Sequence, residues 1–248
     1  MNILKVSITS YPRRFNMLKR VLESLEKQTY TDFDVVITLY KQGCENDLEL
    51  LNKIISNSKL NIEINFVDTN TYCHKNTFEV MKRYPDNPIL VIDDDILREP
   101  DCVKNFLQDY LDYNCIIARN FDYLLKNEVL IKTLGGLRRK RISNMEMYFT
   151  GKEMPNTGGH GILYPPNCFK DPRFYDKDLI LQCSPTSTEV WLYYWLCKEQ
   201  KLLYFKHDQT WKYRLDIGQK DGCLYMTNTT DLRQEYLNKC KKMLGEIS

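Results

Sequence analysis

The stretch that most constrains this chain is ILVIDDDI, which runs from Ile89 to Ile96. Its four leading apolar residues, preceded by Pro88, are typical of a fully buried strand in a parallel sheet. Three aspartates, Asp93 to Asp95, follow at once. Because unpaired carboxylates are costly to bury, they must meet a cation or water where the strand ends. The pattern leaves two alternatives open, a site for a hard divalent cation and a solvated acidic turn.

Strand patterns and helical patterns alternate through the first half of the sequence. Strand patterns cover Ile3–Ile8, Asp34–Tyr40, Ile62–Asp68 and Ile89–Ile92, and apolar residues at helical spacing separate them. Short connections between alternating elements predict an α/β fold with a doubly wound, mostly parallel sheet flanked by helices. Ligands bind beyond the carboxyl ends of such strands. The residues at those ends are Thr9, Ser10, Tyr40, Asp68 and the three aspartates.

The second half of the sequence is less regular. Helical patterns cover Pro100–Tyr113, Cys183–Gln200 and Thr230–Leu244, and two apolar runs read as strands, Cys115–Ala118 and Leu202–Phe205. Residues 120–155 give no clear pattern, and the segment TGGHGILYPP combines glycines that permit tight backbone turns with prolines that stop regular elements. No repeat or low-complexity linker divides the chain. We therefore expect one domain, 1–248, with halves 1–98 and 99–248.

Composition narrows the possible classes of protein. The net charge of +2 gives no electrostatic case for nucleic acid as a partner. Nine cysteines without a CxxC pair argue against structural zinc and fit reduced thiols in the cytosol. Neither GxxxxGK[ST] nor GxGxxG occurs, which weakens the P-loop and dinucleotide-binding interpretations. The chain lacks a signal peptide and a long apolar run, so we expect a cytoplasmic protein.

Four segments, in this order, resemble the GT-A-fold glycosyltransferases, which use nucleotide-sugars as donors. The segments are TSYPRR, HKNTFEVMKRYPDNPILVIDDDI, GGHGILYPP and PTSTEVWL. They are similar to a bacterial family-2-like set of the surface-polysaccharide type, associated with capsule or lipopolysaccharide, in which the last two blocks usually read GGxLYPP and PTADDxWL. The resemblance extends from Ile3 to Asp231.

The resemblance implies a Mn²⁺ or Mg²⁺ ion held by Asp95, with Asp93 and the later His207 as further ligands. Such an ion bridges the two phosphates of the donor and neutralises charge on the departing nucleoside diphosphate. Arg14 would meet phosphate through two donors, Tyr40 would stack, and Asp68 would bind the base. The donor-binding residues implied for a nucleotide-sugar, with UDP as the expected nucleotide, are Thr9, Ser10, Arg14, Tyr40, Asp68, Lys75, Asp93 and Asp94.

The resemblance also implies that Glu189 is the general base of an inverting transfer, at the start of a predicted helix. From the residue alone, a capping role or an interaction with the helix dipole remains an alternative. Thr188 stands where the family carries a first acid, so one carboxylate role is lost or moved. Acceptor contacts are implied at Gly159, His160 and Trp191, and Trp191 either stacks on a sugar or belongs to the core.

The expected function is thus a metal-dependent, inverting transfer of a sugar to an oligosaccharide or lipid-linked glycan. Two basic clusters, Arg138–Arg141 and Lys239–Lys242, leave open a peripheral contact with the inner face of the membrane. Two alternatives remain. One is a nucleotidyl- or phosphotransferase on a similar sheet, and the other is a catalytically degenerate relative that binds glycans.

Overall fold

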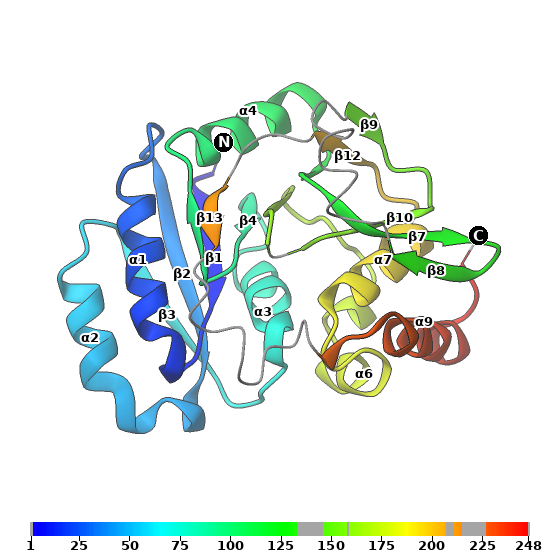
Figure 1. The fold of residues 1–248 in the computed structure, drawn as a ribbon, viewed down its shortest axis with the longest axis horizontal. Coiled ribbons are helices and arrows are strands. Elements are labelled where there is room, and N and C mark those ends of the chain that lie inside the picture. The colour runs from blue at the N-terminus through cyan, green and yellow to red at the C-terminus, as the bar shows by residue number, and fades with distance from the viewer. Residues whose placement is uncertain (1, 133–145, 158, 207–210, 215–226, 248) are drawn as a thin grey trace.

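The computed structural model describes residues 2–132, 146–157, 159–206, 211–214 and 227–247. At the centre of these residues lies a mixed sheet of eight strands (Figure 1). Its strands are β1 (Leu4–Thr9), β2 (Phe33–Tyr40), β3 (Ile62–Val67), β4 (Ile89–Val91), β6 (Ile116–Ala118), β9 (Glu146–Tyr148), β11 (Ile162–Tyr164) and β12 (Leu203–Lys206). They lie in the order β3-β2-β1-β4-β11-β6-β12-β9.

The first four strands form the parallel part of the sheet, as the sequence predicts. β1 pairs in parallel with both β2 and β4, and β2 pairs in parallel with β3. The chain therefore moves outward from β1 to β3 and then returns to the other side of β1. This reversal creates a crevice beyond the carboxyl ends of β1 and β4, which is where open α/β sheets bind ligands.

Helices cover both faces of the sheet. They are α1 (Phe15–Leu25), α2 (Leu48–Ser56), α3 (Lys75–Arg83), α4 (Cys102–Tyr113), α6 (Lys177–Cys183), α7 (Thr188–Lys198) and α9 (Thr230–Leu244). Apolar residues of α1, α2 and α4 pack into one core, and those of α3, α7 and α9 pack into the other. Figure 1 shows α1 and α2 at one end of the molecule and α6, α7 and α9 at the other. The predicted α/β class, a mostly parallel sheet flanked by helices, is confirmed.

Alternate side chains of the central strands belong to the two different cores. On β4, Ile89 and Val91 enter the core beneath α3 and α7, whereas Leu90 enters the core beneath α1 and α4. Successive side chains of a strand point to opposite faces, so a strand covered on both faces must be apolar throughout. This explains why the run before the aspartates contains no polar residue.

Several elements, most of them in the second half, are not predicted by the sequence patterns. A small antiparallel sheet has the order β10-β7-β8, and a two-stranded pair joins β13 to β5. Their bounds are β5 (Ile96–Arg98), β7 (Phe121–Lys126), β8 (Val129–Lys132), β10 (Glu153–Pro155) and β13 (Trp211–Arg214). The glycine- and proline-rich segment supplies β11, which lies antiparallel between β4 and β6. Within the predicted helix Cys183–Gln200, only α7, from Thr188 to Lys198, is helical, and Cys183 is instead the last residue of the unpredicted helix α6.

Short 3₁₀ helices connect several of these elements. They are Pro12–Arg14, Lys41–Gly43, Glu45–Asp47, Tyr72–His74 and Pro172–Tyr175. The cysteines among the described residues are free thiols. In the same part of the chain, no helix has the length and apolar character required to cross a bilayer.

Candidate functional site

A pocket of about 500 Å³ opens where the sheet reverses its strand order, at the ends of β1 and β4. Residues from both halves of the chain line it. The first half contributes Thr9, Ser10, Tyr11, Arg14, Tyr40, Gly43, Cys44, Asn70, Tyr72, Cys73, Lys75, Asn76, Val91 and Asp93 to Asp95. The second half contributes Asp122, Asn156, Thr157, Gly159, Thr186, Thr188, Glu189, Asn228 and Arg233. The fold thus brings most of the predicted site residues together.

Asp94 joins the ends of β1 and β4. It is buried, and its carboxylate accepts a hydrogen bond of 2.6 Å from the Ser10 hydroxyl and an ion pair of 2.7 Å from Arg14. Burial favours a lower pKa for Arg14, but the charges of Asp94 and Asp95 outweigh it and raise the pKa, so the guanidinium stays charged. Arg14 contacts both aspartates through Nη1, whereas its buried Nε has no hydrogen-bond partner.

Asp95 is the member of the triplet with an unused oxygen. Its Oδ2 lies 3.6 Å from Arg14, whereas its buried Oδ1 has no hydrogen-bond partner. A buried carboxylate oxygen without a partner is costly, and a hard cation is the ligand that satisfies it. Among the residues described, no three metal-ligating side chains are grouped closely enough to form a cage. The site therefore fits an ion held by one or two carboxylates and completed by phosphates and water.

The charged residues that line the pocket also favour a bound cation. Among the described residues, five carboxylates and three basic groups line its wall, with a summed formal charge of −2. A divalent cation neutralises this charge. The carboxylates are Asp93, Asp94, Asp95, Asp122 and Glu189, and the basic groups are Arg14, Lys75 and Arg233.

Lys75 carries an ammonium group into the pocket from the first residue of α3. It is only 5 % exposed, and its Nζ donates to Asn70 Oδ1 at 2.9 Å and to the Tyr72 carbonyl at 2.7 Å. Burial lowers the pKa of Lys75 from 10.5 to about 8. Because its ammonium donates to two neutral oxygens, an amide and a carbonyl, Lys75 suits a phosphate ligand.

Glu189 lines the pocket from the first turn of α7, next to Thr188. Of the eleven residues of this helix, only Glu189 and the terminal Lys198 are not buried. A helix that is apolar on all sides is a core element, so the exception needs a reason. The Glu189 carboxylate accepts from Ser187 Oγ at 2.9 Å and from Thr157 Oγ1 at 3.5 Å. Ser187, in the capping position, makes no side-chain bond to the helix backbone. The carboxylate is thus held beside the cavity.

Asp122 and Arg233 complete this side of the pocket, and no sequence pattern singles them out. Asp122 follows Phe121 on β7, and its carboxylate accepts a hydrogen bond of 2.6 Å from Asn156. Burial raises the pKa of Asp122, and the nearby charge of Glu189 adds to the shift. Arg233 lies in the first turns of α9 and is 5 % exposed. Asp122 is thus a second carboxylate near Glu189, supplied by another element.

Two tyrosines that line the pocket on the side formed by the first half were also not predicted from the sequence. Tyr11 is 39 % exposed and Tyr72 is 45 % exposed, and both rings line the pocket. Tyr72 adopts a positive φ of 51°. This conformation is strained for an aromatic residue and tends to occur at functional sites. The TSYPRR block contained Tyr11, but its exposure depends on the turn into the following 3₁₀ helix, which sequence alone does not give.

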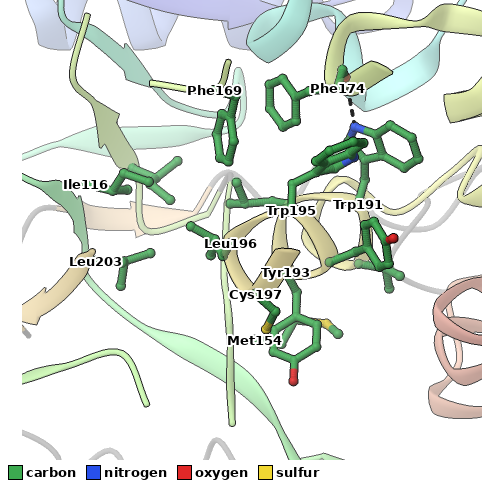
Figure 2. Packing of buried hydrophobic residues seen from close by; sticks show 14 of the residues in the cluster. Ile116, Met154, Phe169, Phe174, Trp191, Tyr193, Trp195, Leu196, Cys197 and Leu203 are labelled. Carbon is green, nitrogen blue, oxygen red and sulfur yellow. Dashed lines mark hydrogen bonds between the residues drawn. The ribbon is translucent and has the colours of Figure 1, made fainter. Parts of the chain in front are cut away.

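Four predicted site residues lie elsewhere or outside the described residues. Trp191 is fully buried in the core, where its Nε1 donates to the Phe174 carbonyl at 3.0 Å (Figure 2). The acceptor-stacking role for Trp191 is therefore wrong. His160 is buried and does not line the pocket, although its neighbour Gly159 does. Asp68 is exposed and is likewise absent from the wall, so its contact with the base stays a prediction. His207 lies outside the described residues.

The basic clusters give little support to membrane contact. Arg138–Arg141 falls outside the described residues. In the second cluster, Lys239 pairs with Glu235, and Lys241 pairs with Glu128. Ion-paired lysines attract an anionic surface less strongly than free ones.

Comparisons with solved structures find the same fold in another protein. The S. aureus protein TarS, residues 1–349 in complex with UDP, has a TM-score of 0.58 at 16% identity, covering 84% of this chain and 59% of that chain. TarS 1–349 without UDP has a TM-score of 0.55 at 16% identity, covering 97% and 72%. UTP-bound UGPase from Acinetobacter baumannii has a TM-score of 0.49 at 8% identity, covering 98% and 96%, which is too low to support an argument.

No family model and no curated protein sequence matches the chain. The chain spans 59% of the length of the UDP-bound TarS structure. At 16% identity this likeness concerns the fold alone. The protein therefore has a GT-A-like α/β fold, with its pocket beyond the carboxyl ends of the parallel strands.

Proposed function

We propose that this protein is a metal-dependent glycosyltransferase that moves a sugar from a nucleotide-sugar, expected to be a UDP-sugar, to a glycan hydroxyl with inversion. The observation that carries the proposal is one pocket containing both the unpartnered Asp95 oxygen and the Glu189 carboxylate. In the TarS structure, which shares the fold, the bound ligand is UDP.

In this proposal, the first half, 1–98, holds the donor. Asp95 and Asp93 hold a Mn²⁺ or Mg²⁺ ion, which neutralises the charge on the leaving diphosphate when it is bound. Lys75 donates to a phosphate oxygen, since its ammonium group lies in the wall beside Asn70. The exposed ring of Tyr11 offers a face for the base, because any nucleobase can stack on an aromatic side chain.

The second half, 99–248, holds the acceptor and moves its proton. Glu189 accepts the proton of the attacking hydroxyl as the acceptor oxygen bonds to the anomeric carbon, while the bond from that carbon to the phosphate oxygen breaks. Ser187 and Thr157 orient the carboxylate through their hydroxyl groups. Thr157 and Gly159 belong to the turn before β11, which sets this side of the pocket.

The acceptor is expected to be an oligosaccharide or a lipid-linked glycan. A lipid-linked acceptor requires the protein to visit a membrane surface without crossing it. Activity on a water-soluble acceptor that does not change when liposomes are added would argue against that form of the proposal.

The direct test is product analysis after incubation with labelled UDP-sugars, with Mn²⁺ or with a chelator in its place. We expect release of UDP that requires the metal and accelerates with an acceptor. Glu189→Gln should retain donor binding and lower turnover by on the order of 10²-fold or more, because it keeps the shape of the side chain but loses the base. Asp178→Asn, at an exposed acid in the first turn of α6, is the matched control and should leave turnover unchanged.

Other products would point elsewhere. Release of pyrophosphate in place of UDP would indicate attack on phosphorus and a nucleotidyltransferase. Binding of UDP-sugar without any turnover would indicate a degenerate, glycan-binding relative. Normal turnover by Glu189→Gln would show that the base has been assigned to the wrong residue.

A further inference from the structure

Arg233 is a buried guanidinium in the wall of the pocket on the Glu189 side. It is 5 % exposed, and its Nε is buried without a hydrogen-bond partner. Its Nη1 donates to the Tyr123 hydroxyl at 3.0 Å and to the Asn228 carbonyl, and the guanidinium lies 4.8 Å from the centre of the Tyr123 ring. All of these partners are neutral.

No carboxylate among the described residues lies within ion-pairing distance of Arg233. Asp122 is near enough for the Arg233 charge to oppose the rise in its pKa, but its carboxylate is held by Asn156. Two other buried or largely buried arginines do lie beside carboxylates, since Arg119 pairs with Asp109 and Arg14 pairs with Asp94. A buried charge without a close counter-charge is costly. Arg233 is therefore a positive charge in the pocket wall that can still bind an anion.

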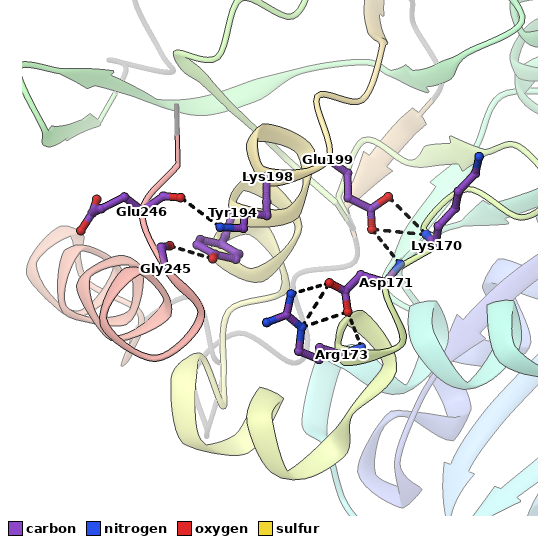
Figure 3. A network of polar contacts seen from close by, with 8 residues as sticks. All are labelled: Lys170, Asp171, Arg173, Tyr194, Lys198, Glu199, Gly245 and Glu246. Atoms are coloured by element: carbon purple, nitrogen blue, oxygen red, sulfur yellow. Dashed lines mark hydrogen bonds and ion pairs between the residues drawn. The ribbon is translucent and has the colours of Figure 1, made fainter.

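The helix that carries Arg233 is firmly anchored. Thr229 caps its start by accepting from the Leu232 backbone N–H at 3.2 Å. Beyond its end, the Tyr194 hydroxyl donates to the Gly245 carbonyl at 2.8 Å, and Lys198 donates to the Glu246 carbonyl at 3.2 Å (Figure 3). A guanidinium held in place before binding loses little freedom when it meets a ligand.

We propose that Arg233 binds an acidic group, a phosphate ester or a carboxylate, on the sugar that occupies the Glu189 side of the pocket. This inference rests on the proposed glycosyl transfer for the identity of the ligand as a sugar. Lys75 and the metal serve the donor diphosphate from the first half, whereas Arg233 lies with Asp122 and Asn228 in the second half. A guanidinium presents paired donors that match the two oxygens of a carboxylate or phosphate.

Binding of three related sugars to the full chain tests the proposal. Glucose, glucose 6-phosphate and glucuronate are titrated by calorimetry into protein saturated with UDP and Mg²⁺, so that the donor site is occupied. We expect at least one acidic sugar to bind about tenfold or more tightly than glucose, a preference worth about 1.4 kcal/mol. Whether phosphate or carboxylate gives the preference identifies the acidic group.

Variants assign the preference to the residue. Arg233→Gln should reduce it to within about twofold, and Arg233→Lys should retain part of it, because lysine keeps the charge but loses the paired donors. Arg83→Gln is the matched control, since Arg83 is half-exposed, pairs with Glu63 and is absent from the pocket wall. A crystal soaked in sulfate with UDP should show the anion on Arg233, independently of sugar stereochemistry.

Two results would overturn the inference. One is equal binding of the three sugars with no sulfate at Arg233, and the other is a preference that Arg233→Gln leaves intact. If Arg233→Gln does not fold, Arg233→Lys and the sulfate soak decide the question. Because these measurements need no turnover, they can fail while metal-dependent UDP release succeeds, and they can succeed while it fails.

Discussion

At the scale of single residues, the pocket separates charges that are already satisfied from charges that are not. Asp94 and Arg14 form an ion pair that ties the segment after β1 to the end of β4. Asp95 Oδ1 and Arg233 Nε are buried without a hydrogen-bond partner, and the buried Lys75 ammonium donates to neutral oxygens. A protein bears the cost of such groups where a ligand later removes it, so these three residues mark the binding function.

Lys75 gives a pH-dependent prediction. Because burial lowers its pKa to about 8, the ammonium loses its proton as the pH rises through that value. Donor phosphates favour the charged form, so UDP binding should take up about half a proton at pH 8 and almost none well below it. UDP affinity should fall as the pH rises from about 7 to 9. Calorimetry in buffers of different ionisation enthalpy measures the uptake.

Lys75→Arg is the control for this prediction, because an arginine remains charged throughout the range. It should bind UDP without the proton uptake. Equal uptake by the wild type and Lys75→Arg would show that another group titrates.

At the scale of elements, the first half could be predicted more completely than the second. In the second half the sequence predicts α4, α7, α9, β6 and β12 but not β7, β8, β10 or α6. The central strands β2 and β4 are mostly apolar because both of their faces are covered, which makes their pattern easy to recognise. β11 has only three residues and follows three glycines within four positions, so its local pattern is that of a turn. It becomes a central strand because β4 and β6 both offer it an edge. Local sequence therefore cannot predict β11, because its pairing depends on strands that are distant in the sequence.

The same reasoning explains which site residues were found. The aspartate triplet and Glu189 stand at the ends of strongly patterned elements, so their positions followed from the pattern and from the resemblance. Asp122 and Arg233 come from a short strand and from a distant helix, and only tertiary packing brings them to one wall. Trp191 lies only two residues after Glu189, but residues two apart on a helix face different sides. Its side chain therefore enters the core, and its assignment to the acceptor site was wrong.

The turn before β11 gives a prediction at this scale. Gly161 has a φ of +88°, and a Cβ there would lie 3.0 Å from the Phe106 ring. Gly161→Ala should therefore destabilise the fold by about 2–3 kcal/mol, through both backbone strain and the clash. Gly151→Ala is the matched control, because its φ of +83° is similar but nothing lies within 4 Å. It should cost about 1 kcal/mol. Chemical denaturation measures the free energy of unfolding of both variants. Equal losses of stability would show that the Phe106 ring moves aside without a cost.

At the scale of the whole molecule, one pocket depends on contacts between the two halves. The buried His74 side chain, just before α3, donates through Nε2 to the Ser184 carbonyl at 2.7 Å, between α6 and α7. The Cys73 thiol beside it contacts the Thr186 carbonyl and Thr188. These contacts fix the donor side relative to the Glu189 side, which is the condition for in-line transfer between two substrates.

The account therefore predicts that metal and nucleotide bind together at Asp95 and independently of Glu189. The most direct measurement is UDP affinity with and without Mn²⁺ for the wild type, Asp95→Ala and Glu189→Gln. We expect Mn²⁺ to strengthen UDP binding to the wild type and Glu189→Gln alike by about tenfold or more, and to have no effect on a folded Asp95→Ala. The account would be contradicted if Mn²⁺ did not change the UDP affinity of the wild type, or if Mn²⁺ still strengthened UDP binding to Asp95→Ala.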